Sequence, residues 1–174
     1  MISVANLFVV DLCSFFRKAV NCIYRKTLPS EFETLVNLRV EFINDLHPEL
    51  DDRALEELQM GTRTYMQYHV SRNLYFGFLG IVGMDIVCSS GMLVYTLPPI
   101  LSADGRKIGH ILNFFTRAPF RGKGYGRGLM QFVKTAAKED GISRLFLNAT
   151  NMGYPLYTKC GFVEPDNKAM QLDL

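Results

Sequence analysis

The sequence has little of what metal sites, disulfide frameworks and polyanion-binding surfaces require. Its four cysteines, Cys13, Cys22, Cys88 and Cys160, form no Cys-x-x-Cys pair, and the three histidines do not supply a zinc-ligand spacing. We therefore expect no metal and no disulfide framework, and the cytoplasm as the compartment. The 19 basic and 17 acidic residues leave a net charge of +2, too small to predict binding to nucleic acid or to an anionic membrane.

The N-terminal segment lacks the features of a membrane span or a secretory signal. Its apolar run, residues 7–16, is short and interrupted by polar residues. The cations Arg17 and Lys18 follow this run, whereas a secretory signal has its basic region first. Residues 1–20 are thus expected to be an extension, either a helix packed on the domain or on a partner chain, or a disordered segment. Residues 21–174 are expected to form one domain.

Glycine is concentrated where an apolar segment gives way to a helical pattern. Residues 121–126 read Arg-Gly-Lys-Gly-Tyr-Gly, after the apolar and aromatic run 111–116. The helix that follows is predicted from apolar residues at helical spacing: Leu129, Phe132, Val133 and Ala136. Glycine lets the backbone approach an anion, and the first N–H groups of a helix have no intrahelical acceptor. The segment therefore predicts a diphosphate cradle.

Two well-known glycine-rich loops do not fit this spacing. A Walker loop requires a serine or threonine after its Gly-Lys pair, but Lys123 is followed by Gly124 and Tyr125. A dinucleotide fingerprint requires a third glycine at the position that Arg127 occupies.

The segment resembles the acyl-CoA signature of the GNAT N-acyltransferase superfamily, Arg/Gln-x-x-Gly-x-Gly/Ala, with Arg121, Gly124 and Gly126 in register. A second motif lies in residues 153–162, which resemble the family's short helix ending in Tyr-x-Lys-x-Gly-Phe, with Tyr157 as the tyrosine. The resemblance covers the last two thirds of the chain closely, and the first third by element order only.

The resemblance implies an α/β fold, a GNAT-like mixed sheet of about six to seven strands flanked by helices. The expected order is β-α-α-β-β-β-α-β-α-β-β, with the sheet splayed open between its fourth and fifth strands. Strands are expected at the following residues: 21–27, 74–80, 81–88, 111–116, 144–149, 162–164 and 169–172. A first helix is expected behind an N-cap at Ser30, a second over 51–70, and a loop at 89–102.

The resemblance also implies acetyl-CoA as co-substrate. The backbone of Phe114, Phe115 and Thr116 is expected to bind pantetheine as an added strand would. The cradle residues expected to bind the diphosphate are Arg121, Gly122, Lys123, Gly124, Tyr125, Gly126 and Arg127. Thr150 and Gly153 stand where many members carry Asn and Ala, so Asn148 or Asn151 is a candidate for the missing asparagine contact or, alternatively, for a cap of the short helix.

In this family the acyl group passes directly from the thioester to an amine, through a tetrahedral intermediate. Tyr157 matches the tyrosine that donates a proton or hydrogen bond to the leaving thiolate, although packing of the short helix would also explain it. The positions considered for the general base are Asp85, which interrupts an apolar strand, His110, which is either a base or a cap of its strand, and Asn113.

The sequence therefore predicts an N-acetyltransferase that uses acetyl-CoA on a primary amine of a small molecule or protein. The alternative is a non-catalytic acyl-CoA-binding module, and the role of Tyr157 distinguishes the two. No motif identifies the amine acceptor, and a homodimer is compatible with the resemblance.

Overall fold

The computed structural model describes residues 22–98, 106–166 and 170–173, so the predicted extension 1–20 lies outside the described residues. The described strands form one sheet in the order β1-β2-β3-β4-β5. The strands are β1 Cys22–Lys26, β2 Tyr75–Val82, β3 Asp85–Thr96, β4 Lys107–Thr116 and β5 Arg144–Phe146. The first four pair antiparallel with their neighbours, and β5 runs parallel to β4.

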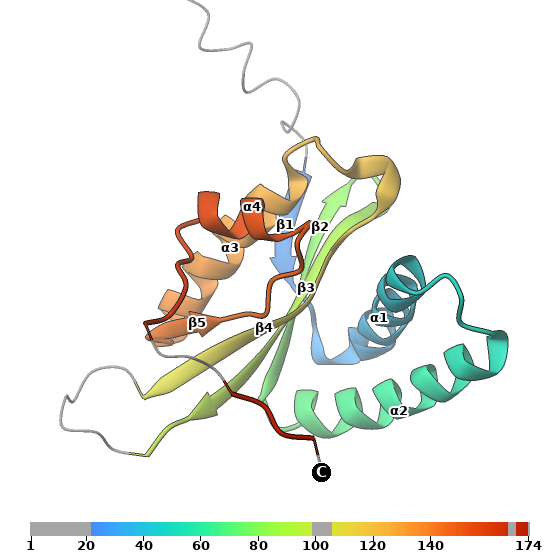
Figure 1. Ribbon diagram of the computed structural model, residues 1–174, viewed down its shortest axis with the longest axis horizontal. Helices are drawn as coiled ribbons and strands as arrows, with labels where there is room; N and C mark the ends of the chain where they lie inside the picture. Colours follow the sequence, from blue (N-terminus) through green and yellow to red (C-terminus); the bar gives the residue numbers. More distant parts are fainter. Residues whose placement is uncertain (1–21, 99–105, 167–169, 174) are drawn as a thin grey trace, which may run out of the picture.

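Helices cover both faces of this sheet (Figure 1). The longer helices are α1 Phe32–Leu46, α2 Asp52–Val70 and α3 Tyr125–Glu139, and the short α4 spans Tyr154–Lys159. Two 3₁₀ turns, Pro29–Glu31 and Ala118–Phe120, precede α1 and α3. The helices α1 and α2 lie together on one side, whereas α3 and α4 lie on the other (Figure 1).

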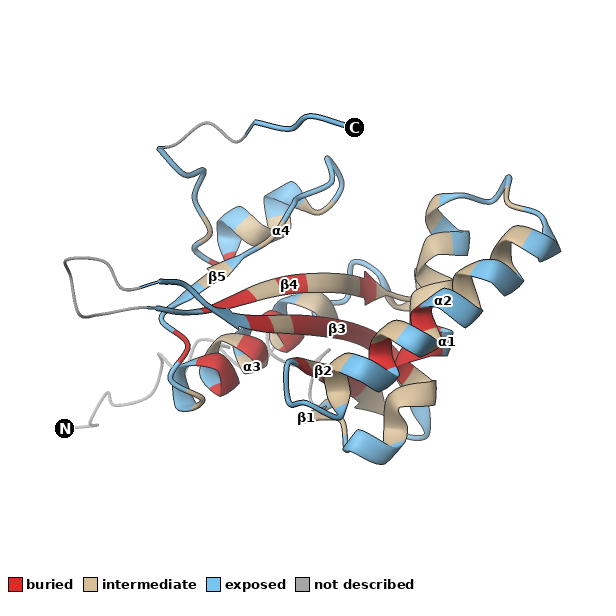
Figure 2. Cartoon of the chain, turned by 90° about the horizontal axis from the view of Figure 1, so that it is seen from below, coloured by how far each residue is buried: buried red, intermediate tan, exposed pale blue. Residues whose placement is uncertain are grey.

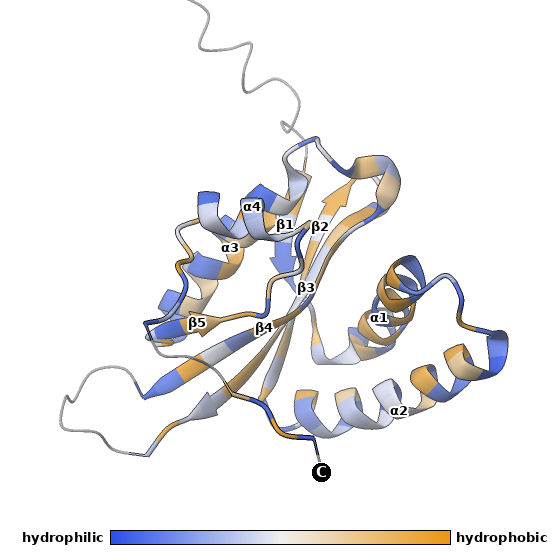
Figure 3. Cartoon of the chain, in the orientation of Figure 1, coloured by the Kyte–Doolittle hydropathy of each residue, from blue (hydrophilic) through white to orange (hydrophobic). Residues whose placement is uncertain are grey.

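The core has two parts, one on each face of the sheet. The larger part joins β2 and β3 to α3, whose buried residues recur at helical spacing: Leu129, Met130, Val133, Ala136 and Ala137. The smaller part joins Tyr75 of β2 to Leu35 and Val36 of α1 and to Met66 of α2. Burial is accordingly greatest along β2, β3 and β4, while the outer sides of the helices are exposed (Figure 2). Hydrophobic residues gather on the strands and the sheet-facing sides of the helices (Figure 3).

The predicted element order is confirmed from β1 through α4, but the predicted strand number is wrong. The described residues form five strands, not six to seven. Residues 162–164 are not a strand, and neither are residues 170–172, while Ala169 lies outside the described residues. Val163 is 87% exposed, and of this run only Phe162 packs against the core. An apolar run becomes a strand only where a neighbour pairs its backbone, and among the described residues no strand pairs with this one.

Two local predictions are also wrong. Residues 89–96 continue β3 where a loop was predicted, because Ser89 and Ser90 are buried in the middle of the sheet. Both pair with β2, and Ser89 also pairs with β4. Ser30 does not cap α1, since it lies inside the preceding 3₁₀ turn. The carboxylate that bonds the backbone there belongs to Glu31, which accepts a hydrogen bond from the Leu28 N–H at 2.7 Å. The second helix starts as predicted, with the Asp51 carboxylate accepting from the Ala54 N–H at 2.8 Å.

Candidate active site

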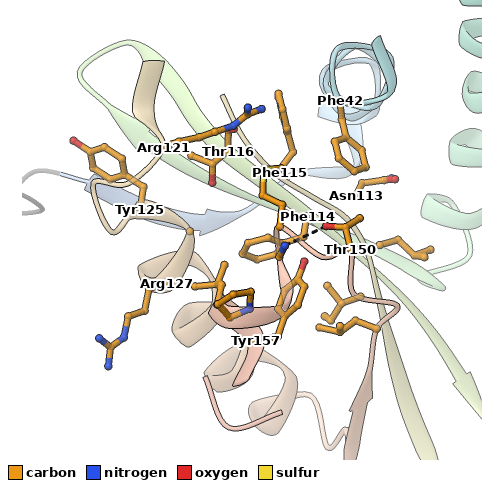
Figure 4. Close-up of a pocket in the computed structure, with 18 of the residues that line it drawn as sticks. Phe42, Asn113, Phe114, Phe115, Thr116, Arg121, Tyr125, Arg127, Thr150 and Tyr157 are labelled. Carbon is orange, nitrogen blue, oxygen red and sulfur yellow. Dashed lines mark hydrogen bonds between the residues drawn. The ribbon is translucent and has the colours of Figure 1, made fainter. Parts of the chain in front are cut away.

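A cleft opens where β4 and β5 part. The two strands pair only through Ile108–Arg144, Gly109–Leu145 and His110–Phe146, after which β5 ends and β4 continues for six residues. The backbone edge of β4 from Ile111 to Thr116 is therefore not covered by β5. A cleft of about 700 Å³ lies along this edge, between α1, the start of α3 and the segment that leads into α4 (Figure 4). This is the predicted splay between the fourth and fifth strands.

A bulge at Asn113 shapes the middle of β4. Ser89 of β3 pairs with Phe115, but Gly91 pairs with Leu112, so β4 contains one residue more than β3 over this interval. Asn113 is at this bulge, and its φ is +53°. As a result Leu112 packs against the α1–α2 part of the core, and Asn113 also turns toward α1 and bonds to Arg39. The next residue, Phe114, packs on the α3 side.

Tyr157 of α4 faces the α3 side of β4. Its ring meets that of Phe114 edge-on, with centroids 5.7 Å apart and planes at 74° (Figure 4). Burial, with a smaller effect of Cys160, raises the pKa of Tyr157 to about 12. The phenol is thus protonated at neutral pH and has an O–H available to donate in the cleft.

The predicted diphosphate cradle forms the other end of the cleft. Gly124 caps α3 with φ of +87°, a left-handed conformation that glycine adopts without steric cost. The first N–H groups of α3, beginning at Tyr125, have no acceptor within the helix. Gly126 lies against β4, because a Cβ there would come within 3.2 Å of the Thr116 Oγ1 atom. The helix start and the uncovered strand edge are therefore close together.

Arg121 ties the cradle to the two neighbouring elements. Its Nε donates to the Thr116 carbonyl at 2.9 Å, and its guanidinium pairs with Asp45 of α1. Figure 4 shows Arg121 and Tyr125 at the cradle end, with the exposed side chain of Arg127 directed away from the other cleft residues.

Most of the predicted site residues line the cleft. They are His110, Phe114, Phe115, Thr116, Arg121, Gly122, Gly124, Tyr125, Gly126, Arg127, Asn148 and Tyr157. Three predicted site residues do not line the cleft. Lys123 is exposed, with its ammonium 5.5 Å from the centroid of the Phe120 ring, and Asn151 is exposed in the turn before α4. Asp85 begins β3 in an exposed position opposite Val82.

Sequence reasoning missed the residues that α1 and the turn before α4 contribute. Arg39, Phe42 and Asp45 form a wall opposite β4, with the Phe42 and Phe115 rings 5.5 Å apart. No motif marks them, since only the fold brings α1 to this edge. Thr150 also lines the cleft and holds the start of α4, its hydroxyl accepting from the Gly153 N–H at 3.1 Å. Neither predicted asparagine caps α4, since its N-cap is Gly153 and no side chain bonds the helix start as a cap.

Across residues 22–98, 106–166 and 170–173, no helix combines the length and apolarity needed to cross a membrane. Within the same ranges, no three His, Cys, Asp or Glu side chains gather as metal ligands would.

One family model matches the part of the chain that contains most of the cleft. Residues 90–162, which contain β4, the cradle and α4, match the model of the Acetyltransferase (GNAT) family. This segment, which is less than half of the chain, is therefore similar to that family of acetyltransferases.

Two curated relatives match over part of their length. Glucosamine 6-phosphate N-acetyltransferase of Trypanosoma brucei brucei is 28% identical over 89 residues, which are 51% of this chain and 58% of the relative. Probable glucosamine 6-phosphate N-acetyltransferase 2 of Oryza sativa subsp. japonica is 37% identical over 60 residues, which are 34% of this chain and 36% of the relative. The chain thus matches little more than half of the first relative and about a third of the second.

Solved structures match over more of the chain. A predicted acetyltransferase with acetyl-CoA from Clostridium acetobutylicum has a TM-score of 0.73 and 25% identity, covering 87% of this chain and 96% of that one. A GCN5-related N-acetyltransferase from Ralstonia eutropha JMP134 has a TM-score of 0.72 and 25% identity, covering 87% and 99%.

Proposed function

We propose that this protein is an N-acetyltransferase that moves the acetyl group of acetyl-CoA directly to a primary amine of a small molecule or protein. The observation that carries the proposal is the continuous cleft along the uncovered edge of β4. It joins the cradle at the start of α3 to the protonated phenol of Tyr157. The family match over residues 90–162 and the acetyl-CoA named for the Clostridium structure support the choice of acyl donor.

The cofactor would lie along β4 from the cradle toward α4. The N–H groups at the start of α3 and the glycines of residues 122–126 would bind the diphosphate. The backbone of residues 114–116, which β5 does not cover, would bond to the amides of the pantetheine arm. This course brings the thioester to Phe114 and Tyr157, whose rings are in contact. Holding both reactants in the same cleft supplies proximity, which contributes a large part of catalysis in bimolecular reactions.

The reaction then requires one new bond, one broken bond and one proton transfer. The amine nitrogen attacks the thioester carbon, the tetrahedral intermediate collapses, the C–S bond breaks and the sulfur leaves as a thiolate. Tyr157 donates a hydrogen bond to this sulfur as its charge develops. Because the Tyr157 pKa of about 12 exceeds the ordinary thiol pKa of about 8.5, the phenol stabilises the thiolate mainly by hydrogen bonding rather than by full proton transfer.

His110 is the candidate to accept the amine proton, because it lines the cleft three residues before Asn113 on β4. Asp85 has weaker support for this role, since it begins β3 in an exposed position outside the cleft lining.

Tyr157→Phe tests the proposal. Removal of the hydroxyl is expected to lower kcat by about 10²-fold, the typical effect of deleting one transition-state hydrogen-bond donor. The Kd for acetyl-CoA should stay within about threefold, because Phe keeps the ring that packs on Phe114. Titration calorimetry with acetyl-CoA and CoA gives the affinity, and thiol release over a panel of amines gives the rate. Tyr154→Phe is the matched control, since Tyr154 is on the same helix but outside the cleft, with its hydroxyl bonded to Glu164.

Three outcomes would contradict parts of the proposal. Absence of acetyl-CoA binding would refute the cofactor assignment. Binding without thiol release on any amine would favour a non-catalytic acyl-CoA-binding module. Equal kcat for Tyr157→Phe and wild type would leave the ring with a packing role only.

A further inference from the structure

The α1 wall of the cleft contains an arginine without an acidic partner. Arg39 is half-buried and lines the cleft, and its Nη1 donates to the Oδ1 of Asn113. Within the described residues no carboxylate lies within 4.0 Å of its guanidinium. Each of the other partly buried arginines among the described residues pairs with an acid; the pairs are Arg25–Glu31, Arg63–Glu33 and Arg117–Glu41. Arg121, which is exposed, pairs with Asp45.

This arrangement orients the guanidinium of Arg39 without neutralising it. Asn113 is uncharged, and its own Nδ2 donates to the buried Tyr75 hydroxyl at 3.0 Å, which fixes the amide. Arg39 has five N–H donors, of which one is used on Asn113. A partly desolvated cation is costly without a counter-ion, and the planar fork of arginine matches the oxygens of carboxylate and phosphate. The unused donors are therefore available to an anion that enters the cleft.

The position of Arg39 fits the acceptor rather than the cofactor. Arg39 bonds to Asn113, which precedes Phe114, and the Phe114 ring contacts Tyr157. The cation thus lies beside the expected reaction centre, on the opposite face of β4 from Tyr157. Asp45, the carboxylate on the same wall, is paired with Arg121 and so is engaged at the cradle end. Because Arg121 pairs with Asp45, this carboxylate would repel an anionic group bound to Arg39 only weakly.

We infer that the acceptor is a small amine that also carries an anionic group, a carboxylate or a phosphate, and that Arg39 binds this group. The inference rests on the proposed function, because it concerns the acceptor half of the same cleft. The anion held by Arg39 would hold the amine of the same molecule near the thioester carbon. Arg39 is accordingly a specificity-determining residue of the cleft.

Pairs of amines that differ by one anionic group test the effect of that charge separately from the effect of the amine. One pair is glucosamine 6-phosphate and glucosamine, which differ by a phosphate, and the other is phenylalanine and 2-phenylethylamine, which differ by a carboxylate. In wild type the anionic member of at least one pair should have the higher kcat/KM, by roughly 10- to 100-fold for a charge-assisted pair. The pair that shows the preference tells which of the two anions the cleft takes.

Arg39→Gln should reduce that anionic-to-neutral ratio of kcat/KM by roughly 10-fold or more, mainly through KM, while retaining an N–H donor for Asn113. Arg39→Lys should restore part of the ratio, since it keeps the charge but not the planar fork. Arg53→Gln is the control, because it removes the same charge from an arginine whose side chain is 86% exposed on α2, and it should not change the ratio.

Equilibrium binding provides a readout that does not need turnover. Calorimetric titration with glucosamine 6-phosphate and with phenylalanine should give a tighter Kd for wild type than for Arg39→Gln with at least one of them, and an unchanged Kd for Arg53→Gln. Equal affinities of wild type and Arg39→Gln for both ligands, or equal use of the anionic and neutral members of both pairs, would overturn the inference. A protein that binds these ligands through Arg39 but releases no thiol would instead contradict the proposed function alone.

Discussion

Gly128→Ala tests how closely α3 is packed onto the sheet beneath the cradle. A Cβ at Gly128 would lie 2.2 Å from the hydroxyl oxygen of Tyr24 and 2.5 Å from the ring carbon that bears it. Tyr24 extends from β1, and its hydroxyl donates to the Tyr125 carbonyl at 3.1 Å, in the first turn of α3. The opposite edge of the ring lies near the backbone of Gly80, because a Cβ there would come within 3.0 Å of the Tyr24 Cε1 atom. The new methyl group must therefore displace either the ring or the helix.

Two opposing effects decide the sign of the change in stability. Replacing glycine by alanine inside a helix is normally worth about 1 kcal/mol in favour of folding. Overpacking costs about 1–3 kcal/mol, and loss of the Tyr24 hydrogen bond costs about 1 kcal/mol more. The net expectation is a loss of about 1–3 kcal/mol in the free energy of unfolding. For a domain of this length that loss corresponds to a Tm lower by roughly 3–10 °C.

Urea unfolding followed by circular dichroism measures this change, and Gly61→Ala is its control. Gly61 is also inside a helix, α2, but no atom lies within 4 Å of the Cβ position, so this variant should gain up to about 1 kcal/mol. In a Tyr24→Ala background, Gly128→Ala should cease to be destabilising, because the ring that it meets is gone. A Gly128→Ala variant as stable as Gly61→Ala would refute the packing derived from these distances.

Two other measurements concern titratable groups. The Arg25 guanidinium and the Leu28 N–H hold the pKa of Glu31 at about 2, below its usual 4.5, so its contribution is present above pH 4.5 and is lost as the pH falls toward 2. Glu31→Gln should therefore lower the free energy of unfolding by about 1 kcal/mol at pH 7, after allowance for solvent screening of this partly exposed pair. Urea unfolding should show a progressively smaller loss from pH 4.5 to 3, and a loss independent of pH would contradict the ion pair. Burial raises the pKa of the Cys88 thiol to about 12, which leaves a thiolate fraction of roughly 10⁻⁴ at pH 8. Pulsed iodoacetamide labelling read by mass spectrometry should modify Cys88 only after unfolding, and rapid labelling of the native protein would show that the thiol is accessible.

The cradle and Tyr157 were predictable because their signals are local in the sequence. Residues 121–127 combine the glycines, the cations and the helix start in one short segment, and the α3 periodicity begins directly after them. Tyr157 is likewise set by a ten-residue motif that forms one helix and its end. In both segments, neighbours in sequence are neighbours in space.

The α1 wall of the cleft was not predictable because it depends on contacts between distant segments. Arg39 reaches the cleft only because α1 packs against β4, 74 residues away along the chain. The same limit explains the error at Ser89 and Ser90, whose composition is typical of a loop but which the neighbouring strands pair and bury. It also explains the terminal strands, since the apolar run at 162–164 carries no information on whether a partner strand is present.

The bulge at Asn113 connects the two halves of the cleft. In a strand without a bulge, side chains alternate strictly, so a residue after Leu112 would point to the α3 face and the next to the α1 face. The extra residue keeps Asn113 on the α1 face, where it bonds to Arg39, and returns Phe114 to the α3 face, where it meets Tyr157. One backbone irregularity therefore sets both the proposed anion contact of the acceptor and the ring beside the proposed thiolate donor. The register of β4 thus couples the two sides of the cleft. A change that removes the bulge should disturb both the contact of Asn113 with Arg39 and the contact of Phe114 with Tyr157.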